Sequence, residues 1–219
     1  MQQQTATENY INYKFTYINC EFISKMKDIT TNEMNFVLKI LKSPEVEYNA
    51  TSIAKVLKIS SMGALKIAKK LEKEGIIKGV KKGKATFYSL NLDEDYVQQY
   101  VKFLLQREAA QAPVYIRVWV RELRKLTNAY SVILFGSVLY KEKEARDIDA
   151  VVITDQAHLE KVKKEIQDIN IVNIKKVHPV YQTKEDLKNN IKKPDQVVLN
   201  ALKGIMIKGE DILLEALQK

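Results

Sequence analysis

Hydrophobic and polar positions alternate with two different periods along this chain. Between residues 30 and 74, apolar residues recur every three or four positions, which is the spacing of amphipathic helices. After residue 130, short apolar runs of strand length stand between amphipathic stretches of helical length. We therefore expect an α+β protein, in which a helical N-terminal part precedes a small mixed β-sheet with flanking helices.

The N-terminal part predicts three helices followed by a β-hairpin. Thr30 and Glu33 have the spacing of a capping box, so the first helix begins there. The pattern places the second helix at 51–58 and the third from Ser60 or Ser61 to Glu74. Gly75 ends the third helix, because glycine readily adopts the left-handed conformation that follows a helix. Two apolar segments, 76–80 and 85–90, then flank a basic turn at 81–84.

Three short helices and a hairpin, in this order, are the winged helix-turn-helix arrangement, which we assign to residues 26–92. Residues 30–92 resemble the winged-helix regulators of archaea and bacteria, and the stretch from Leu71 to Ile77 is similar to their helix-to-wing junction. The resemblance implies a double-stranded DNA partner, although the same fold also mediates protein contacts.

The charge of this part agrees with a DNA partner. The chain has a net charge of +9, and ten lysines stand against two acids between Ala54 and Lys84. Small polar residues at the start of a recognition helix reach base edges, and lysines reach phosphates. The alternative is a solvated basic face without a ligand. The candidate DNA-binding residues are Ser61, Lys66, Lys69, Lys70 and Lys73 on the third helix, and Lys81, Lys82 and Lys84 on the wing.

A linker helix is expected at residues 93–112, and Pro113 marks the start of a second domain at 113–219. The helix carries an apolar stripe of Val97, Tyr100, Val101 and Leu104. Two interpretations of the stripe remain open: it forms a homodimer interface, or it packs inside the chain.

The second domain contains a strand, a Gly-Ser turn and a second strand with two acids. Gly136 and Ser137 follow the apolar run 132–135, and Asp147 and Asp149 accompany the next apolar run. Acids at positions i and i+2 of a strand point to one face, where they can hold a hard divalent cation. A Gly-Ser turn lets backbone N–H groups and a hydroxyl approach a phosphate.

Together, Phe135-Gly136-Ser137 and Asp147-Ile148-Asp149 resemble the signature of the DNA polymerase β-like nucleotidyltransferase superfamily. The resemblance covers about residues 114–217 and is closest to the minimal nucleotidyltransferase domains of prokaryotes. It implies that Gly136 and Ser137 bind the phosphates of a nucleoside triphosphate. It also implies that Asp147 and Asp149 are the catalytic residues and bind Mg²⁺ or Mn²⁺.

The chain departs from this family at the third strand. The family usually carries a third carboxylate there, but residues 169–182, where we expect the strand, contain no acid. Asn170 and Asn173 are the nearest polar candidates, and neither amide can act as a base. His178 either faces the site or is structural, and its position beside Pro179 favours the structural role. We expect His158 to be exposed. Arg146 precedes Asp147 where a serine is usual, and it either pairs with Asp147 or touches phosphate.

Three functions follow from these observations. The first is a DNA-binding regulator whose second domain binds a nucleotide, a metal ion or both. The second is an active Mg²⁺-dependent nucleotidyltransferase that transfers a nucleoside monophosphate to a hydroxyl of a protein or small molecule. The third is an antitoxin with a small helical toxin as its partner. The missing third acid favours the first function, and catalytic activity stays open.

Composition limits where the protein acts. No run of eighteen apolar residues exists, so no membrane span is expected. One cysteine, Cys20, excludes an internal disulfide framework, and a reducing cytoplasm is expected. Residues 1–25 form an N-terminal extension that is either a hairpin or a tail, and Met26 is a candidate native start.

Overall fold

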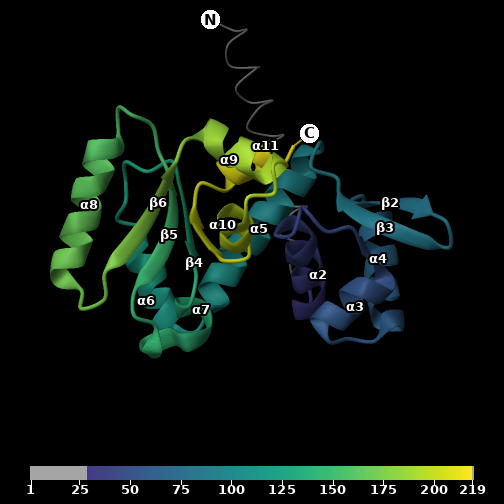
Figure 1. Cartoon of the computed structure of the whole chain (residues 1–219). Helices are drawn as coiled ribbons and strands as arrows, with labels where there is room; N and C mark the ends of the chain where they lie inside the picture. Colours follow the sequence, from purple (N-terminus) through teal and green to yellow (C-terminus); the bar gives the residue numbers. More distant parts are fainter. Residues whose placement is uncertain (1–28, 219) are drawn as a thin grey trace, which may run out of the picture.

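The computed structural model describes residues 29–218, so the expectations about residues 1–25 and Met26 lie outside the described residues. Two lobes lie side by side, with a long helix between them (Figure 1). The N-terminal lobe contains α2 (Thr31–Leu41), β1 (Tyr48–Asn49), α3 (Ala50–Leu57), α4 (Ser61–Lys73), β2 (Ile77–Lys82) and β3 (Ala85–Leu90). Its strands form an antiparallel sheet in the order β1-β3-β2. This is the winged-helix arrangement, as the sequence predicted.

Local caps explain where these helices begin and end. Thr30 Oγ1 accepts a hydrogen bond from the Glu33 amide (3.2 Å), and the Glu33 carboxylate accepts one from the Thr30 amide (2.7 Å). Ser60 caps α4 through the amide of Gly63 (3.0 Å). Gly75 has a φ of +72°, which confirms its expected left-handed conformation. The capping residues therefore fix the helix boundaries locally.

The turn of the wing is tighter than expected. Lys82 pairs with Ala85, so only Gly83 and Lys84 form the turn. Lys81 and Lys82 belong to β2 rather than to a loop at 81–84. Gly83 has a φ of +63°, and a two-residue hairpin turn requires such a conformation.

The apolar stripe of the linker helix packs inside the chain. The helix is α5 (Asp95–Gln111), and Val97, Tyr100, Val101 and Leu104 are all at most 4% exposed. It contacts α2 of the first lobe, and it contacts α6 (Val114–Leu123), β7 (Ile205–Lys208) and α11 (Glu210–Leu217) of the second. The stripe is therefore not available as a dimer interface.

The C-terminal lobe is a four-stranded mixed sheet between two layers of helices. The strand order is β6-β5-β4-β7, in which β5 and β6 are parallel and the other pairs are antiparallel. The remaining elements are α6 (Val114–Leu123), β4 (Ser131–Phe135), α7 (Val138–Lys141), the short 3-10 helix η1 (Glu142–Glu144), β5 (Ile148–Ile153), α8 (Leu159–Val172), β6 (Val177–Gln182), α9 (Lys184–Lys192) and α10 (Gln196–Leu202).

Alternate residues of the central strands enter two different cores. Val132 and Leu134 pack in a core with residues of α6 and α8. Ile133 and Val151, on the other face of the sheet, pack in a core with residues of α9, α10 and α11. The second core continues without interruption into the winged helix through α5. One of the two cores is thus shared by both lobes.

The third strand begins later than the sequence suggested. We expected it within 169–182, but α8 continues to Val172 and β6 begins at Val177. Ile166 and Ile169 are buried at helical spacing, and their packing on the sheet extends the helix. The prediction for this segment was therefore wrong at its start.

This difference removes both asparagines from the set of candidate metal ligands. Asn170 lies in α8 and accepts a hydrogen bond from the Val177 amide (2.7 Å). Asn173 follows the end of α8 and donates to Glu122 Oε2 (3.1 Å) and to the Ile169 carbonyl (2.9 Å). Both side chains thus support the connection between α8 and β6.

A partly buried ion pair lies where the two lobes meet, with the Lys42 side chain 8% exposed and that of Glu108 24% exposed. Lys42 Nζ, at the end of α2, donates to Glu108 Oε1 on α5 (2.6 Å) and to the carbonyl of Gly204 (2.5 Å). Burial lowers the pKa of Lys42 and raises that of Glu108, and their mutual attraction opposes both shifts. The backbone needs glycine at 204, because a Cβ there would collide with the Leu134 carbonyl.

Replacing Lys42 by methionine should lower the free energy of unfolding by about 2 kcal/mol, because it leaves the partly buried Glu108 carboxylate without its partner. Urea unfolding measures this change. The double variant Lys42→Met/Glu108→Leu should recover much of the loss, since no buried charge remains. Lys55→Met, at an exposed position, is the control and should change stability by less than about 0.5 kcal/mol. A Lys42→Met effect as small as that of the control would contradict the assignment.

No helix within residues 29–218 is long and apolar enough to cross a membrane.

Candidate metal and nucleotide site

The candidate site lies at one end of β4, β5 and β6. Phe135 pairs with Asp149 across β4 and β5, and Asp149 pairs with His178 across β5 and β6. This register places the turn at Gly136 on one side of Asp149 and His178 on the other. Residues that pair across neighbouring strands point to the same face, so Asp149 and His178 share a face of the sheet.

Three side chains gather at this end of the sheet. Ligand atoms of Asp147, Asp149 and His178 all lie within 4.8 Å of one another. His178 Nδ1 lies 3.3 Å from Asp147 Oδ2. Asp147 stands just before the first residue of β5, and its side chain reaches the same place as that of Asp149. The two acids are therefore adjacent, as their spacing predicted.

His178 lies at the site, which is the less favoured of the two positions that the sequence left open for it. A structural role was favoured, but its side chain is 61% exposed and its ion-pair partner is Asp147. A signal was present in the sequence: Val177 is a core residue, so in a strand the next residue must point to the opposite face. That face carries Asp149, but the adjacency depends on the pairing of β5 with β6.

Gly136 fits this place for two reasons. Its φ is +83°, which side chains with a Cβ rarely adopt. A Cβ at this position would also lie well inside van der Waals contact with the carboxylate of Asp149. Ser137 follows at the start of α7, where its carbonyl accepts the amide of Lys141 (2.8 Å). The Gly-Ser turn is thus packed directly against the acids.

The site has an unbalanced negative charge. Burial, and then the neighbouring Asp147, raise the pKa of Asp149, while His178 opposes these effects. Arg146 is exposed and forms no ion pair with any residue from 29 to 218, so the expected pairing with Asp147 is not seen. Lys175 also forms no ion pair with the two acids, and its ammonium group donates to the backbone carbonyl of Ala145. Two carboxylates and an imidazole with no lysine or arginine partner among residues 29–218 fit a divalent cation.

The sequence suggested that His158 is exposed, but the structure places it in a hydrogen-bonded cluster. It is half-buried, and its Nδ1 lies 2.7 Å from Asp155 Oδ1 and 3.2 Å from the Tyr130 hydroxyl. Tyr130 precedes β4 and Asp155 follows β5, so this cluster lies at the opposite end of these strands from Asp149. The two histidines of the chain therefore lie at opposite ends of the sheet.

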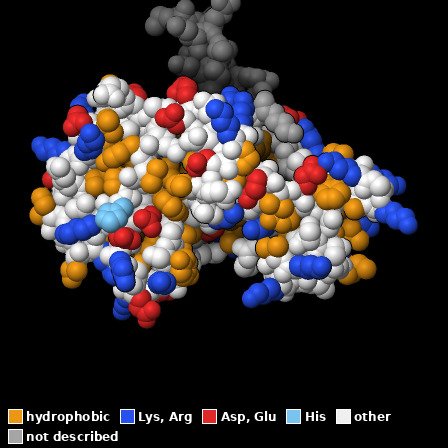
Figure 2. All heavy atoms as spheres, viewed as in Figure 1, with side chains coloured by type: hydrophobic (Ala, Val, Ile, Leu, Met, Phe, Trp, Pro, Cys, Tyr) orange, Lys and Arg blue, Asp and Glu red, His pale blue; other side chains and the backbone are white. Residues whose placement is uncertain are grey.

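The candidate DNA-binding residues lie on the surface of α4 and the wing. All of the residues Ser61, Lys66, Lys69, Lys70, Lys73, Lys81, Lys82 and Lys84 are exposed. Two of the lysines have acidic partners, since Lys70 pairs with Glu33 (2.8 Å) and Lys82 pairs with Glu47. Figure 2 shows basic side chains projecting from the wing and from the lower edge of the winged helix.

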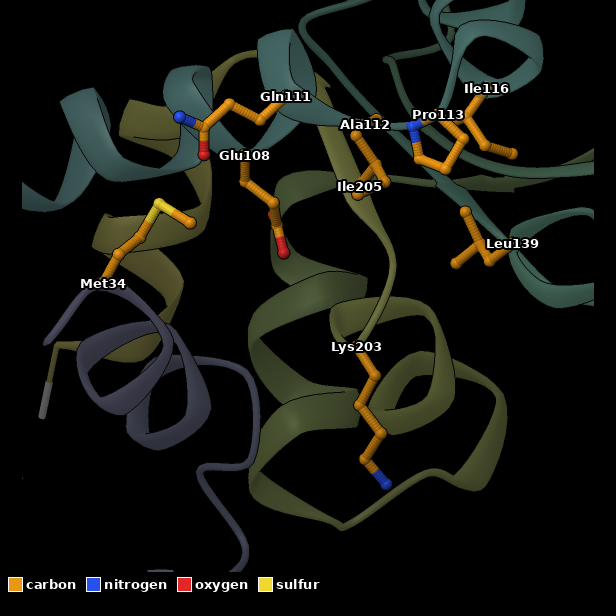
Figure 3. A pocket seen from close by; sticks show the side chains of 9 residues that line it. All are labelled: Met34, Glu108, Gln111, Ala112, Pro113, Ile116, Leu139, Lys203 and Ile205. Carbon is orange, nitrogen blue, oxygen red and sulfur yellow. The ribbon is translucent and has the colours of Figure 1, made fainter. Parts of the chain in front are cut away.

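A cavity of about 390 Å³ opens where the lobes meet (Figure 3). Met34 of α2 and Glu108 of α5 line its winged-helix side, and Leu139 of α7 lines the other. Because α7 begins directly after Gly136 and Ser137, this cavity adjoins both the first lobe and the helix that starts at the candidate site. No feature of the sequence predicted it.

Comparison with known families identifies the second lobe. The model described as "Nucleotidyltransferase domain" matches residues 116–208. Residues 116–208 form a nucleotidyltransferase domain. The match includes the Gly-Ser turn, both acids and His178, and nucleotidyltransferase domains generally use a divalent metal ion. No curated protein matches the chain.

Solved structures similar to this chain include three bacterial proteins of low sequence identity. The adhesin competence repressor AdcR from Streptococcus pyogenes is 17% identical (TM-score 0.34), with 52% of this chain and 82% of that chain covered. The heme sensor PefR from Streptococcus agalactiae is 18% identical (TM-score 0.34), with 58% and 90% covered. YusO from Bacillus subtilis is 15% identical (TM-score 0.31), with 56% and 92% covered. The winged-helix assignment rests on the strand order and helix order of the chain itself.

Gly136→Ala should destabilise the nucleotidyltransferase domain and displace the Asp149 carboxylate, because the new Cβ occupies its position. Gly83→Ala is the matched control, since Gly83 also has a positive φ but nothing lies within 4 Å of its Cβ position. Urea unfolding should show a loss of about 1 kcal/mol for the control, the usual cost of a left-handed alanine. The loss for Gly136→Ala should be clearly greater, and equal losses would refute the close approach.

Proposed function

We propose that this protein is a DNA-binding regulator whose nucleotidyltransferase domain binds a divalent metal ion together with a nucleotide. The observation that carries the proposal is the combination of two surfaces in one chain. An exposed basic helix and wing lie on one lobe, and a Gly-Ser turn packed against two carboxylates lies on the other. We also propose the domain boundaries 26–92, 93–112 and 113–219.

Exposure and pairing of the lysines support DNA binding. Lys66, Lys69, Lys73, Lys81 and Lys84 are exposed and form no ion pair within the described part of the chain. Unpaired lysines are available to neutralise phosphates, which supplies most of the affinity of non-specific DNA binding. Ser61 lies at the first position of α4, where a recognition helix contacts base edges.

The acidic site supports binding of a metal–nucleotide complex. Asp147, Asp149 and His178 would hold the cation, and the turn at Gly136 and Ser137 would contact phosphate. A bound divalent cation would neutralise the charge of a triphosphate next to these acids. Burial and the charge of Asp147 raise the pKa of Asp149. A bound cation would oppose both effects and favour the ionised form of Asp149.

The alternative is an active nucleotidyltransferase that moves a nucleoside monophosphate to a hydroxyl of a protein or small molecule. The presence of His178 beside the two acids favours this function more than the sequence suggested, because an imidazole can accept a proton. The regulator remains our first proposal, since β6 carries no third carboxylate. We do not propose a toxin partner.

Replacing Lys66, Lys69, Lys81 and Lys84 together by alanine should abolish tight binding to duplex DNA. The slope of log affinity against log salt should fall by about 0.9 for each phosphate that the variant no longer neutralises. Fluorescence anisotropy at several salt concentrations measures both quantities. Lys70 and Lys82 remain unchanged, because both already have acidic partners.

The matched control replaces four exposed lysines of the other lobe, Lys161, Lys164, Lys188 and Lys192, by alanine. The two variants have the same net charge, so general electrostatic attraction to DNA changes equally. We expect the control to retain most of the affinity. Equal losses in the two variants, or no salt-dependent DNA binding by the wild type, would exclude the proposed surface.

Labelled ATP, CTP, GTP and UTP with Mg²⁺ or Mn²⁺ separate the regulator from the enzyme. If the domain only binds, label should stay in the nucleotide, and Asp149→Asn should weaken nucleotide binding in an equilibrium assay. Label that moves to the protein or to an added acceptor, and does so less in Asp149→Asn, would establish the alternative. Asp168→Asn, an exposed acid outside the site, is the control and should not change either readout.

A further inference from the structure

The third ligand position of the site carries a nitrogen donor rather than a carboxylate oxygen. His178 lies on β6 directly opposite Asp149, on the strand where the nucleotidyltransferase resemblance leads us to expect an acid. Its side chain is 61% exposed, and among residues 29–218 its ion-pair partner is Asp147. A histidine that stabilises a core is usually buried and hydrogen-bonded, so this one has no evident structural task.

Nitrogen and oxygen donors select different cations. Mg²⁺ takes oxygen ligands almost exclusively and gives up its waters reluctantly. Imidazole suits first-row transition cations, whereas two carboxylates suit both groups of metals. A set of two carboxylates and one imidazole therefore shifts the balance away from Mg²⁺.

We propose that His178 is a metal ligand and that it makes this site select a divalent first-row transition cation, such as Mn²⁺ or Co²⁺, over Mg²⁺. The arrangement that supports this is the group of Asp147, Asp149 and His178, whose donor atoms lie within 4.8 Å of one another. The proposal rests on the metal site of the proposed function and adds the identity of its third ligand and the class of cation.

Local structure holds His178 at the site. Pro179 follows it and pairs with Ala150, on an edge strand where the missing N–H of proline is tolerated. Val177 on its other side is buried in the core with residues of α6 and α8. The backbone around His178 is thus fixed by neighbours on both sides, although the imidazole itself reaches solvent.

The test compares cation binding by the purified full chain and by His178→Asp. Co²⁺ binding is followed by visible absorption, Mn²⁺ binding by the electron paramagnetic resonance of the free ion, and Mg²⁺ binding by competition against Mn²⁺. Any site with nitrogen and oxygen donors prefers Co²⁺ to Mg²⁺ to some degree, so the diagnostic quantity is the change between proteins. The ratio of Co²⁺ to Mg²⁺ affinity should fall by about tenfold or more in His178→Asp.

Three further variants make the result interpretable. His178→Ala should weaken Co²⁺ binding and change the Co²⁺ spectrum without introducing a new ligand. His158→Ala removes the chain's other histidine, at the far end of the strands, and should leave both the spectrum and the affinity ratio unchanged. Asp149→Asn should weaken the binding of every cation, which shows that the signal comes from this site.

The outcomes separate the inference from the proposed function. If Asp149→Asn weakens binding but His178→Asp leaves the affinity ratio and the spectrum unchanged, the metal site stands and the role of His178 is refuted. If the folded wild-type protein binds none of the three cations, both the inference and the metal site of the proposed function fail. DNA binding is measured separately and does not depend on either result.

Discussion

The burial of β5 on both faces of its sheet is the constraint on which the rest of the molecule depends. Ala150 and Val152 pack on one face, and Val151 and Ile153 on the other. A strand with this much apolar surface must lie inside a sheet with helices on both sides. The acids Asp147 and Asp149 stand at the beginning of this fixed strand, so the position of the candidate site follows from the core.

The core of the second lobe does not end at the lobe boundary. Residues of the winged helix, α5 and one face of the four-stranded sheet form one cluster, and the partly buried pair of Lys42 and Glu108 lies beside it. The cavity next to this pair reaches from α2 to Leu139, near the Gly-Ser turn. The winged helix and the nucleotidyltransferase domain are thus in direct physical contact.

Much of the fold could be predicted because its signals are local. The capping box of Thr30 and Glu33, the Ser60 cap and the left-handed Gly75 each act within a few residues. The boundary between α8 and β6 could not be predicted in the same way. The segment from Ile169 to Val172 suits either a strand or a helix, and burial of Ile166 and Ile169 against the sheet decided for the helix. Two roles were expected of Arg146, an ion pair with Asp147 or a contact with phosphate. The side chain is exposed and forms no ion pair with any residue from 29 to 218, so the first role is not seen.

The sequence by itself determined the order of helices and strands in the winged helix and the two apolar strands beside the Gly-Ser turn. It also determined the adjacency of Asp147 and Asp149, because residues two apart in extended chain share a face. Only the tertiary structure decided that His178 joins these acids. Its position depends on parallel pairing of β5 with β6, and the paired residues Asp149 and His178 are far apart in the chain. Only the tertiary structure decided that the apolar stripe of α5 packs inside the chain. The sequence of an apolar helix face is the same whether it packs against its own chain or against another. No local pattern records which surfaces meet, since that choice is made by the core as a whole.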